Sequence, residues 1–169
     1  MTEDIVRRLG HMTLGTRLKR IGERLQAQTQ TLISETDGPE AGSVNSPVLA
    51  ALWHNGPLSI GDLTRAIGQS QPGITRMVGK LKARGLAEIV PDPDDRRVSR
   101  VSLTPAGEDL VRRLEKGAWQ AVEAAVTEAC DGLSGSLLEQ LDQLEDRLAA
   151  RPLPKRVRVR VKARQAPVL

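Results

Sequence analysis

The 169-residue sequence has almost no aromatic residues: it contains two tryptophans and neither phenylalanine nor tyrosine. A core must therefore be built from leucine, valine, isoleucine, alanine and methionine, which favours helices packed on helices over a β-sandwich. The sequence also lacks any run of the roughly 18–20 apolar residues that span a bilayer, and it has no apolar N-terminal stretch typical of a signal peptide. We therefore expect no membrane association, and one domain or a small module with helical extensions.

Cysteine and histidine are equally scarce. Cys130 is the single cysteine, which excludes an internal disulfide framework and fits a reducing, cytoplasmic location. Two histidines, His11 and His54, make a poor set of metal ligands with one distant cysteine, so we expect no metal and no cofactor. The sequence has no glycine-rich phosphate loop, and no serine or cysteine is paired with a suitably placed histidine. These absences argue against an enzyme.

The net charge of +4 conceals a segregation of charge along the chain. Residues 1–58 carry six acids and six bases, whereas residues 59–104 carry five acids and eight bases. Residues 105–150 carry ten acids and four bases, and residues 151–169 carry seven bases and no acid. Positive charge therefore lies in the 59–104 segment and in the C-terminal tail, where it can neutralise nucleic-acid phosphates.

The most informative pattern lies between residues 59 and 104. A short amphipathic helix is predicted over 60–67, opened by Ser59 and closed by Gly68, and a second helix follows Ser70 and ends at Gly85. Strands are predicted over 86–90 and 98–103, joined by a tip rich in proline, aspartate and arginine. Two helices around a tight turn, followed by a basic-tipped hairpin, are the layout of a winged helix-turn-helix that reads DNA.

The second helix of this pair has one apolar face and one polar, basic face. Its apolar face carries Ile74, Met77, Val78 and Leu81; its opposite face carries Gln71, Thr75, Gly79 and Lys82, flanked by Arg76 and Lys80. Glutamine and arginine can pair with purine edges in a major groove, and the threonine methyl can contact a thymine methyl. Ser70 caps a helix N-terminus whose free N–H groups suit a phosphate oxygen. An ordinary solvated helix face has the same pattern, so this helix alone leaves both interpretations open.

The hairpin tip, residues 91–97, strengthens the DNA-binding interpretation. It places acids directly before Arg96 and Arg97 on a short loop. An arginine there can enter a minor groove, especially a narrow A·T-rich one, and a neighbouring carboxylate can hold its guanidinium in a bidentate pose. The alternative is an ordinary polar turn with ion pairs that contribute little in water.

Helices are predicted on both sides of this module. Apolar residues recur at spacings of three and four in two narrow seams, which are typical of helix-to-helix contact. The first seam is Leu14, Leu18, Ile21, Leu25 and Leu32, with Gln28 filling the gap before Leu32, and the second is Leu137, Leu141, Leu144 and Leu148. A homodimer that interlaces its termini explains both seams best, and an intramolecular helical bundle is the alternative.

The remaining segments are predicted from their capping and helix-breaking residues. Residues 37–42 read as a loop, and a helix with Pro47 in its first turn ends at Asn55. Thr104-Pro105 opens one long helix to about Cys130, and Ser134 caps the last helix. Pro152 and Pro154 end regular helix. The alternating Arg/Val tail that follows is predicted to be a disordered arm that attracts DNA, with an edge strand as the alternative.

We therefore predict a mainly α (α+β) fold: a winged helix-turn-helix with N- and C-terminal dimerisation helices. The predicted domains are an N-terminal dimerisation helix (1–42), a DNA-binding module (43–104), C-terminal dimerisation helices (105–150) and a basic tail (151–169).

Residues from about 9 to 148 resemble the MarR-type winged-helix transcription regulators. The resemblance is densest in residues 56–59, 69–76, 81–86 and 92–107. Its most specific element is an Asp-x-Arg in the wing, seven residues ahead of the threonine of Leu-Thr-x-x-Gly, which here identifies Asp95 and Arg97. The chain departs from the family in lacking tyrosine and phenylalanine, which often line an effector pocket, and in its longer, more basic tail.

The resemblance implies a repressor that binds a pseudopalindromic operator in double-stranded DNA as a homodimer. It implies that Arg97 enters the minor groove and that Asp95 positions it. The expected DNA-binding residues are Ser70, Gln71, Thr75, Arg76, Lys80, Asp95, Arg96 and Arg97. Two symmetric recognition helices reach successive major grooves about 34–36 Å apart, so we expect half-site centres about 10 bp apart.

The family commonly releases DNA when a small anionic aromatic compound, an oxidant or a metal is sensed. By position, Arg17, Trp53 and His54 are candidate effector contacts; alternatively Trp53 belongs to the core and His54 faces solvent. Cys130 is expected to be a small buried thiol rather than a sensor. The alternative function is a winged-helix protein-interaction module without sequence-specific DNA binding. The polar, basic face of the second helix argues against it, because interface cores favour aromatic residues and methionine.

Overall fold

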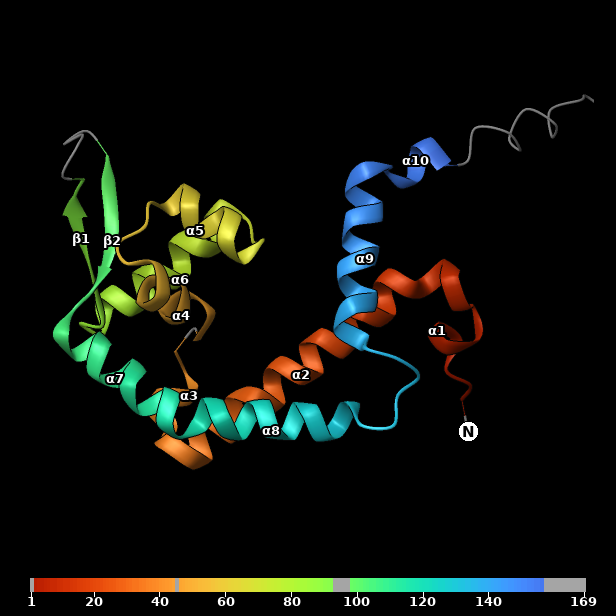
Figure 1. Cartoon of the computed structure of the whole chain (residues 1–169), viewed down its shortest axis with the longest axis horizontal. Coiled ribbons are helices and arrows are strands. Elements are labelled where there is room, and N and C mark those ends of the chain that lie inside the picture. Colours follow the sequence, from red (N-terminus) through yellow and green to blue (C-terminus); the bar gives the residue numbers. More distant parts are fainter. Residues whose placement is uncertain (1, 45, 93–97, 157–169) are drawn as a thin grey trace, which may run out of the picture. The chain divides into compact units, whose positions relative to one another are not determined.

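The computed structural model describes residues 2–44, 46–92 and 98–156. Within them β1 and β2 form a two-stranded antiparallel ribbon and the other elements are helices (Figure 1). This confirms the expected mainly helical fold with a two-strand wing. None of the described helices is long and apolar enough to cross a membrane. The elements are α1 (Ile5–Arg8), η1 (Gly10–Thr13), α2 (Leu14–Asp37), α3 (Pro39–Gly42), α4 (Ser46–Asn55), α5 (Ile60–Ile67), α6 (Gln71–Ala83), β1 (Ala87–Pro91), β2 (Ser99–Leu103), α7 (Pro105–Lys116), α8 (Ala118–Cys130), α9 (Leu137–Ala150) and α10 (Leu153–Arg156).

The chain divides into two compact units, Met1–Ala125 and Val126–Leu169, with the boundary inside α8. The first unit holds one aliphatic core, as the near absence of aromatic residues predicts. Trp53 and Trp119 are only partly buried and pack against this core. The largest fully buried side chains are Leu49, Leu63, Ile74, Leu81, Leu114, Val48, Val101 and Val111.

The prediction of one helix from Pro105 to about Cys130 is wrong. The helix breaks at Gly117, where φ is −126° and ψ is −97°. The carboxylate of Asp37, the last residue of α2, accepts a hydrogen bond of 2.9 Å from the Ala118 N–H and so satisfies a free donor at the start of α8. The break therefore depends on a partner 81 residues away, which local periodicity does not reveal.

Smaller differences also have local causes. Residues 37–42, expected as a loop, contain the short helix α3. Its Gly42 packs against α2 so closely that a Cβ there would lie 1.7 Å from Ser34 Oγ. The last long helix is capped by Ser136, whose hydroxyl accepts from the Glu139 N–H at 3.3 Å, and not by Ser134. A further helical turn, α10, follows Pro152. The strands lie within one residue of their predicted bounds.

Candidate DNA-binding interface

Helix α5 begins with a reciprocal capping box. The Ser59 hydroxyl accepts from the Asp62 N–H at 3.1 Å, and the Asp62 carboxylate accepts from the Ser59 hydroxyl at 2.6 Å and the Ser59 N–H at 3.3 Å. These hydrogen bonds from Ser59, with the nearby charge of Arg65, hold the pKa of Asp62 below its ordinary value. The helix ends at Gly68, whose φ of +69° lies in the left-handed region that glycine adopts without strain. This start and stop match the sequence prediction.

Helix α6 turns its apolar face into the core and its polar face to solvent. Ile74, Val78 and Leu81 are buried, and Met77 packs against the core in a partly buried position. The four residues predicted to contact DNA from this helix are exposed: Gln71, Thr75, Arg76 and Lys80. The helix therefore has the two faces that its sequence pattern predicts.

Ser70 lies at the N-terminus of α6, and Gly79 lies on its outer face. The Ser70 hydroxyl accepts from the Gly73 N–H at 3.4 Å and so caps the helix. A Cβ at Gly79 would meet nothing within 4 Å, so no contact within the described residues requires glycine there. The missing side chain leaves the backbone open on the face that carries Thr75.

The ribbon is joined to the helix-turn-helix through the segment that precedes α5. Leu58 donates to the Val101 carbonyl at 3.0 Å and accepts from the Val101 N–H at 2.8 Å, which forms an isolated antiparallel bridge. This short bridge makes the residues before Ser59 a second strand-like neighbour of β2, beside β1. Helix α5 and the wing therefore share one backbone connection.

The Leu-Thr-x-x-Gly segment closes the other end of the ribbon. The Thr104 hydroxyl donates to the Gly85 carbonyl at 2.6 Å and accepts from the Gly107 N–H at 3.1 Å, so one side chain joins the end of α6 to the start of α7. A Cβ at Gly107 would lie 2.0 Å from the Leu86 carbonyl oxygen. Position 107 therefore requires glycine, because it packs closely against Leu86, the residue directly before β1.

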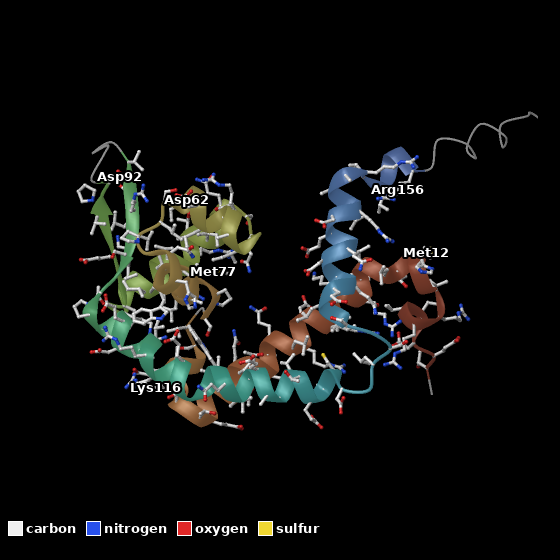
Figure 2. All side chains as sticks on the ribbon, viewed as in Figure 1. Met12, Asp62, Met77, Asp92, Lys116 and Arg156 are labelled. Carbon is white, nitrogen blue, oxygen red and sulfur yellow. The ribbon has the colours of Figure 1, made fainter. Side chains whose placement is uncertain are left out.

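The wing carries an ion pair between a buried aspartate and a partly exposed arginine, which the sequence pattern did not identify. Asp92 is 5 % exposed, and its carboxylate accepts a hydrogen bond from Nε of Arg100 on β2. Figure 2 shows Asp92 where the described part of the ribbon ends, beyond β1. The three predicted wing contacts, Asp95, Arg96 and Arg97, lie outside the described residues.

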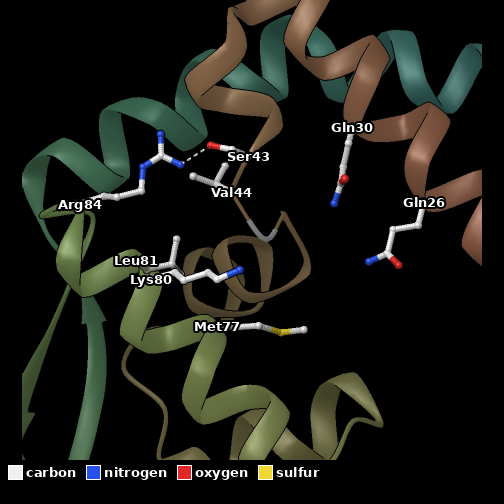
Figure 3. Close-up of a pocket in the computed structure, with 8 residues that line it drawn as sticks. All are labelled: Gln26, Gln30, Ser43, Val44, Met77, Lys80, Leu81 and Arg84. Atoms are coloured by element: carbon white, nitrogen blue, oxygen red, sulfur yellow. Dashed lines mark hydrogen bonds between the residues drawn. The ribbon is translucent and has the colours of Figure 1, made fainter.

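A cavity of about 200 Å³ lies between α2, α6 and the segment that leads into α4 (Figure 3). The side chains of Gln26 and Gln30 from α2 and Lys80 from α6 point into the same space. The lining contains two cations and no carboxylate. It consists of Gln26, Gln30, Ser43, Val44, Met77, Lys80, Leu81 and Arg84.

The two cations of this cavity differ in how they are held. The Arg84 guanidinium donates to the Ser43 hydroxyl at 2.6 Å and to the Glu40 carbonyl at 2.9 Å, so its partners are neutral oxygens and its charge is not neutralised by them. Lys80 makes no ion pair with any described residue. The cavity is therefore electropositive, which the sequence did not reveal because its residues come from three segments spread between positions 26 and 84.

The three predicted effector contacts do not line this cavity. Arg17 is exposed on α2. Trp53 is partly buried and packs against the core. The Cζ atom of Arg112 lies over its ring, 5.5 Å from the ring centroid. His54 is exposed and borders a separate shallow cavity between α4 and α5. The described part of the chain thus does not gather the three around one cavity, and their effector role stays a prediction.

Metal ligands do not cluster in the described residues: no group of three or more histidine, cysteine, aspartate or glutamate side chains is placed to hold an ion. Cys130 is partly buried at the end of α8.

Comparison with known proteins identifies the family. Residues 43–98, which contain α4, α5, α6 and β1, match the sequence profile of the MarR family. This segment belongs to the MarR family. The chain is also similar to the HTH-type transcriptional repressor NicR of Pseudomonas putida. The two are 29% identical over 143 residues, which are 85% of this chain and 85% of NicR. The chain is a transcriptional regulator and not an enzyme, which confirms both expectations.

Solved structures share the fold of this chain. BpsR of Bordetella bronchiseptica, whose DNA binding is regulated by 6-hydroxynicotinic acid, is 27% identical, with a TM-score of 0.61 over 80% of this chain and 91% of BpsR. A MarR mutant from Escherichia coli complexed with operator DNA has a TM-score of 0.61 at 19% identity, over 86% of this chain and 99% of that chain. At that identity the second likeness shows the fold alone.

Proposed function

We propose that this MarR-family regulator represses transcription by binding a pseudopalindromic operator as a homodimer, and that a small organic anion releases it. The observation that carries the proposal is helix α6. Its apolar face is anchored in the core, its N-terminus is capped by Ser70, and its exposed face carries Gln71, Thr75, Arg76 and Lys80. The name of the relative NicR, a transcriptional repressor, supports repression.

In this proposal α6 lies in the major groove and the wing reaches the adjacent minor groove. Gln71 and Arg76 read base edges, Thr75 contacts a thymine methyl, and Ser70 and Lys80 bind phosphates. Arg97 enters the minor groove, Asp95 orients its guanidinium, and Arg96 binds the backbone beside it. The contacts at the base of the ribbon support the proposed role of the wing, because they hold the two strands from which the tip extends.

The homodimer is supported by apolar side chains that one chain leaves uncovered. Helix α2 has 24 residues but buries only Ile33. Leu18, Ile21 and Leu25, at seam spacing, are 37%, 45% and 41% exposed. The second unit likewise exposes Leu133, Leu137, Leu138, Leu148 and Leu153. A second copy of the chain would cover both surfaces, as the family resemblance implies.

The effector is proposed to occupy the electropositive cavity beside α6. Its volume of about 200 Å³ is below the roughly 300–1,000 Å³ of pockets for drug-sized ligands, so it suits a single-ring compound. Arg84 and Lys80 would attract a carboxylate, and Gln26 and Gln30 would hydrogen-bond a polar substituent. The regulation of BpsR by 6-hydroxynicotinic acid supports this ligand class.

The occupied cavity would also weaken DNA binding directly, because Lys80 belongs to both sites. An anion that holds its ammonium group removes that charge from the phosphate contact. A regulator of chromosomal DNA works in the compartment that holds the DNA, so the cytoplasmic location is part of the proposal.

The test is a gel shift against the DNA upstream of the protein's own gene, with unrelated competitor DNA in excess. The proposal predicts a discrete complex that competitor does not displace. Replacing Gln71 with Ala should change base preference within the half-site more than overall affinity. A complex that unrelated DNA displaces completely would instead favour a winged-helix module that binds a protein.

Effector release is tested with 6-hydroxynicotinic acid and benzoic acid as probes. Either acid should dissociate the complex of the wild-type protein, and Gln30→Leu should reduce that response while leaving operator affinity unchanged. His54→Leu, outside the cavity, is the matched control. A response lost in the His54 variant and kept in the Gln30 variant would move the effector site to the residues first predicted.

A further inference from the structure

The base of the wing holds the single buried charged residue in the described part of the chain, Asp92, whose side chain is 6% exposed. It follows β1 directly and lies at the start of the wing tip. Removal of a carboxylate from water is strongly unfavourable unless a charged partner and hydrogen bonds compensate for the lost hydration. A buried aspartate at this point of an otherwise aliphatic ribbon therefore needs a structural or functional reason.

Arg100 supplies the compensation and extends it to a second segment. Its Nε donates to the Asp92 carboxylate, and its Nη1 donates to the Pro57 carbonyl at 3.1 Å. The Asp92 N–H donates to the Val98 carbonyl at 2.9 Å, which closes the ribbon directly below the tip. One guanidinium thus joins β2, the start of the wing tip and the segment before α5.

These contacts bear on orientation, because a two-stranded ribbon is marginally stable by itself. The bridge between Leu58 and Val101 holds the lower part of β2 against the helix-turn-helix. Arg100 lies one residue nearer the tip and adds a side-chain connection to Pro57 at that level. Without the contact from Arg100 to Pro57, the end of the ribbon would keep its strand pairing. It would lose its attachment, above the Leu58–Val101 bridge, to the segment that leads into α5.

We propose that Asp92 and Arg100 form a clamp that sets the direction of the wing relative to α6, so that both reach the same DNA duplex. The clamp residues are positioning residues: they act through the wing tip and are not themselves DNA contacts. The inference rests on the proposed DNA-binding function. It deepens that function by assigning wing orientation to two residues that lie outside the predicted contact set.

The clamp makes a prediction opposite in sign to simple electrostatics. Asp92→Ala removes a negative charge and frees a cationic side chain, so the general attraction between protein and DNA should increase. If Asp92 positions the wing, affinity for the operator should instead fall by about tenfold or more, a factor that corresponds to about 1.4 kcal/mol. Glu88→Gln, which removes an exposed negative charge from β1, is the matched control and should leave affinity unchanged or slightly raise it.

A second variant separates position from charge. Arg100→Lys keeps the positive charge but replaces the planar fork with one ammonium, which cannot reproduce the guanidinium's bonds to both Asp92 and Pro57. Operator binding should weaken with little change in the thermal unfolding midpoint. In an Arg97→Ala background neither clamp variant should weaken binding further, because the tip contact through which they act is already absent.

Two measurements decide the proposal together: operator affinity of the full-length variants, and hydrogen–deuterium exchange without DNA. In Asp92→Ala, exchange should rise at the backbone amides of position 92 and of Leu58, while the amides of α7 keep their protection. Unchanged exchange, or operator binding as tight as wild type with faster exchange, would overturn the clamp. A wild-type protein that shows no sequence preference, although Asp92→Ala still exchanges faster, would refute the proposed operator binding and leave the clamp as a purely structural contact.

Discussion

At the scale of single residues, polar side chains in this protein act through specific partners more than through overall charge. Asp62 closes the capping box of α5, and Asp92 and Thr104 each connect two backbone segments by hydrogen bonds. Their positions fix where α5, the wing and α7 begin. Apart from Ser70, which also caps α6, the residues proposed to bind DNA are different: they are exposed on α6 or belong to the wing tip. We expect them to act on affinity and base preference while leaving stability unchanged.

Arg97 gives the sharpest prediction for a single DNA contact. Arg97→Ala should weaken operator binding by about 1–3 kcal/mol and reduce the slope of log affinity against log salt by about 1, because a minor-groove cation is lost. Filter binding at several salt concentrations measures both quantities. Lys116→Ala, which removes an exposed charge at the end of α7, should change neither. Identical slopes for wild type and Arg97→Ala would exclude the minor-groove contact.

Asp62 predicts a pH dependence of stability. Its folded-state pKa lies below the ordinary value of 3.8, so the carboxylate stabilises the fold above that value, and this stabilisation is lost as pH falls through the lower folded pKa. Asp62→Asn should therefore lower the thermal unfolding midpoint at pH 7, and the difference from wild type should shrink below about pH 4. Asp142→Asn, on an exposed position of α9, is the control. A difference that stays constant down to pH 2 would contradict the capping-box account.

At the scale of elements, the sequence predicted best what local signals determine. Ser59 and Gly68 mark the ends of α5, and Ser70 the start of α6, because caps and left-handed glycines act within a few residues. The break at Gly117 was not predictable in this way, since Asp37 satisfies the start of α8 from a distant helix. The contact from Arg100 to Pro57 and the cavity likewise depend on segments that only the fold brings together.

Two glycines with opposite surroundings test this account of the elements. Gly107→Ala should destabilise the fold by about 1–3 kcal/mol, because its Cβ would overlap the Leu86 carbonyl. Gly79→Ala should instead stabilise α6 by up to about 1 kcal/mol, since alanine is the better helix former and the space is open. Urea unfolding measures both changes. Gly79→Ala should also weaken operator binding; normal binding would show that the DNA backbone does not approach there.

At the scale of the whole molecule, the account requires two chains. The seam on α2 was predicted from its spacing, and the structure leaves its central residues uncovered in a single chain. Spacing identifies an apolar stripe but not what covers it, because an intramolecular bundle and a dimer have the same sequence pattern. In the described residues no neighbouring side chains bury Leu18, Ile21 or Leu25, which favours the second copy.

Ile21→Glu should therefore convert the protein to monomers at micromolar concentration and abolish operator binding, because a carboxylate would be buried in an apolar interface. Sedimentation velocity measures the mass. Thr16→Glu, on the opposite face of the same helix, is the matched control and should stay dimeric. If Ile21→Glu also stayed dimeric, α2 would not form the interface.

The most direct test of the account is the affinity of the wild-type protein for synthetic inverted repeats of its half-site. Two recognition helices that enter successive major grooves on one side of the duplex require half-site centres about 10 bp apart. Affinity should be highest at that separation and should fall at least tenfold at about 15 bp, where the second half-site faces the opposite side of the helix. Equal affinity at both separations, or for a single half-site, would contradict the paired, symmetric reading of DNA.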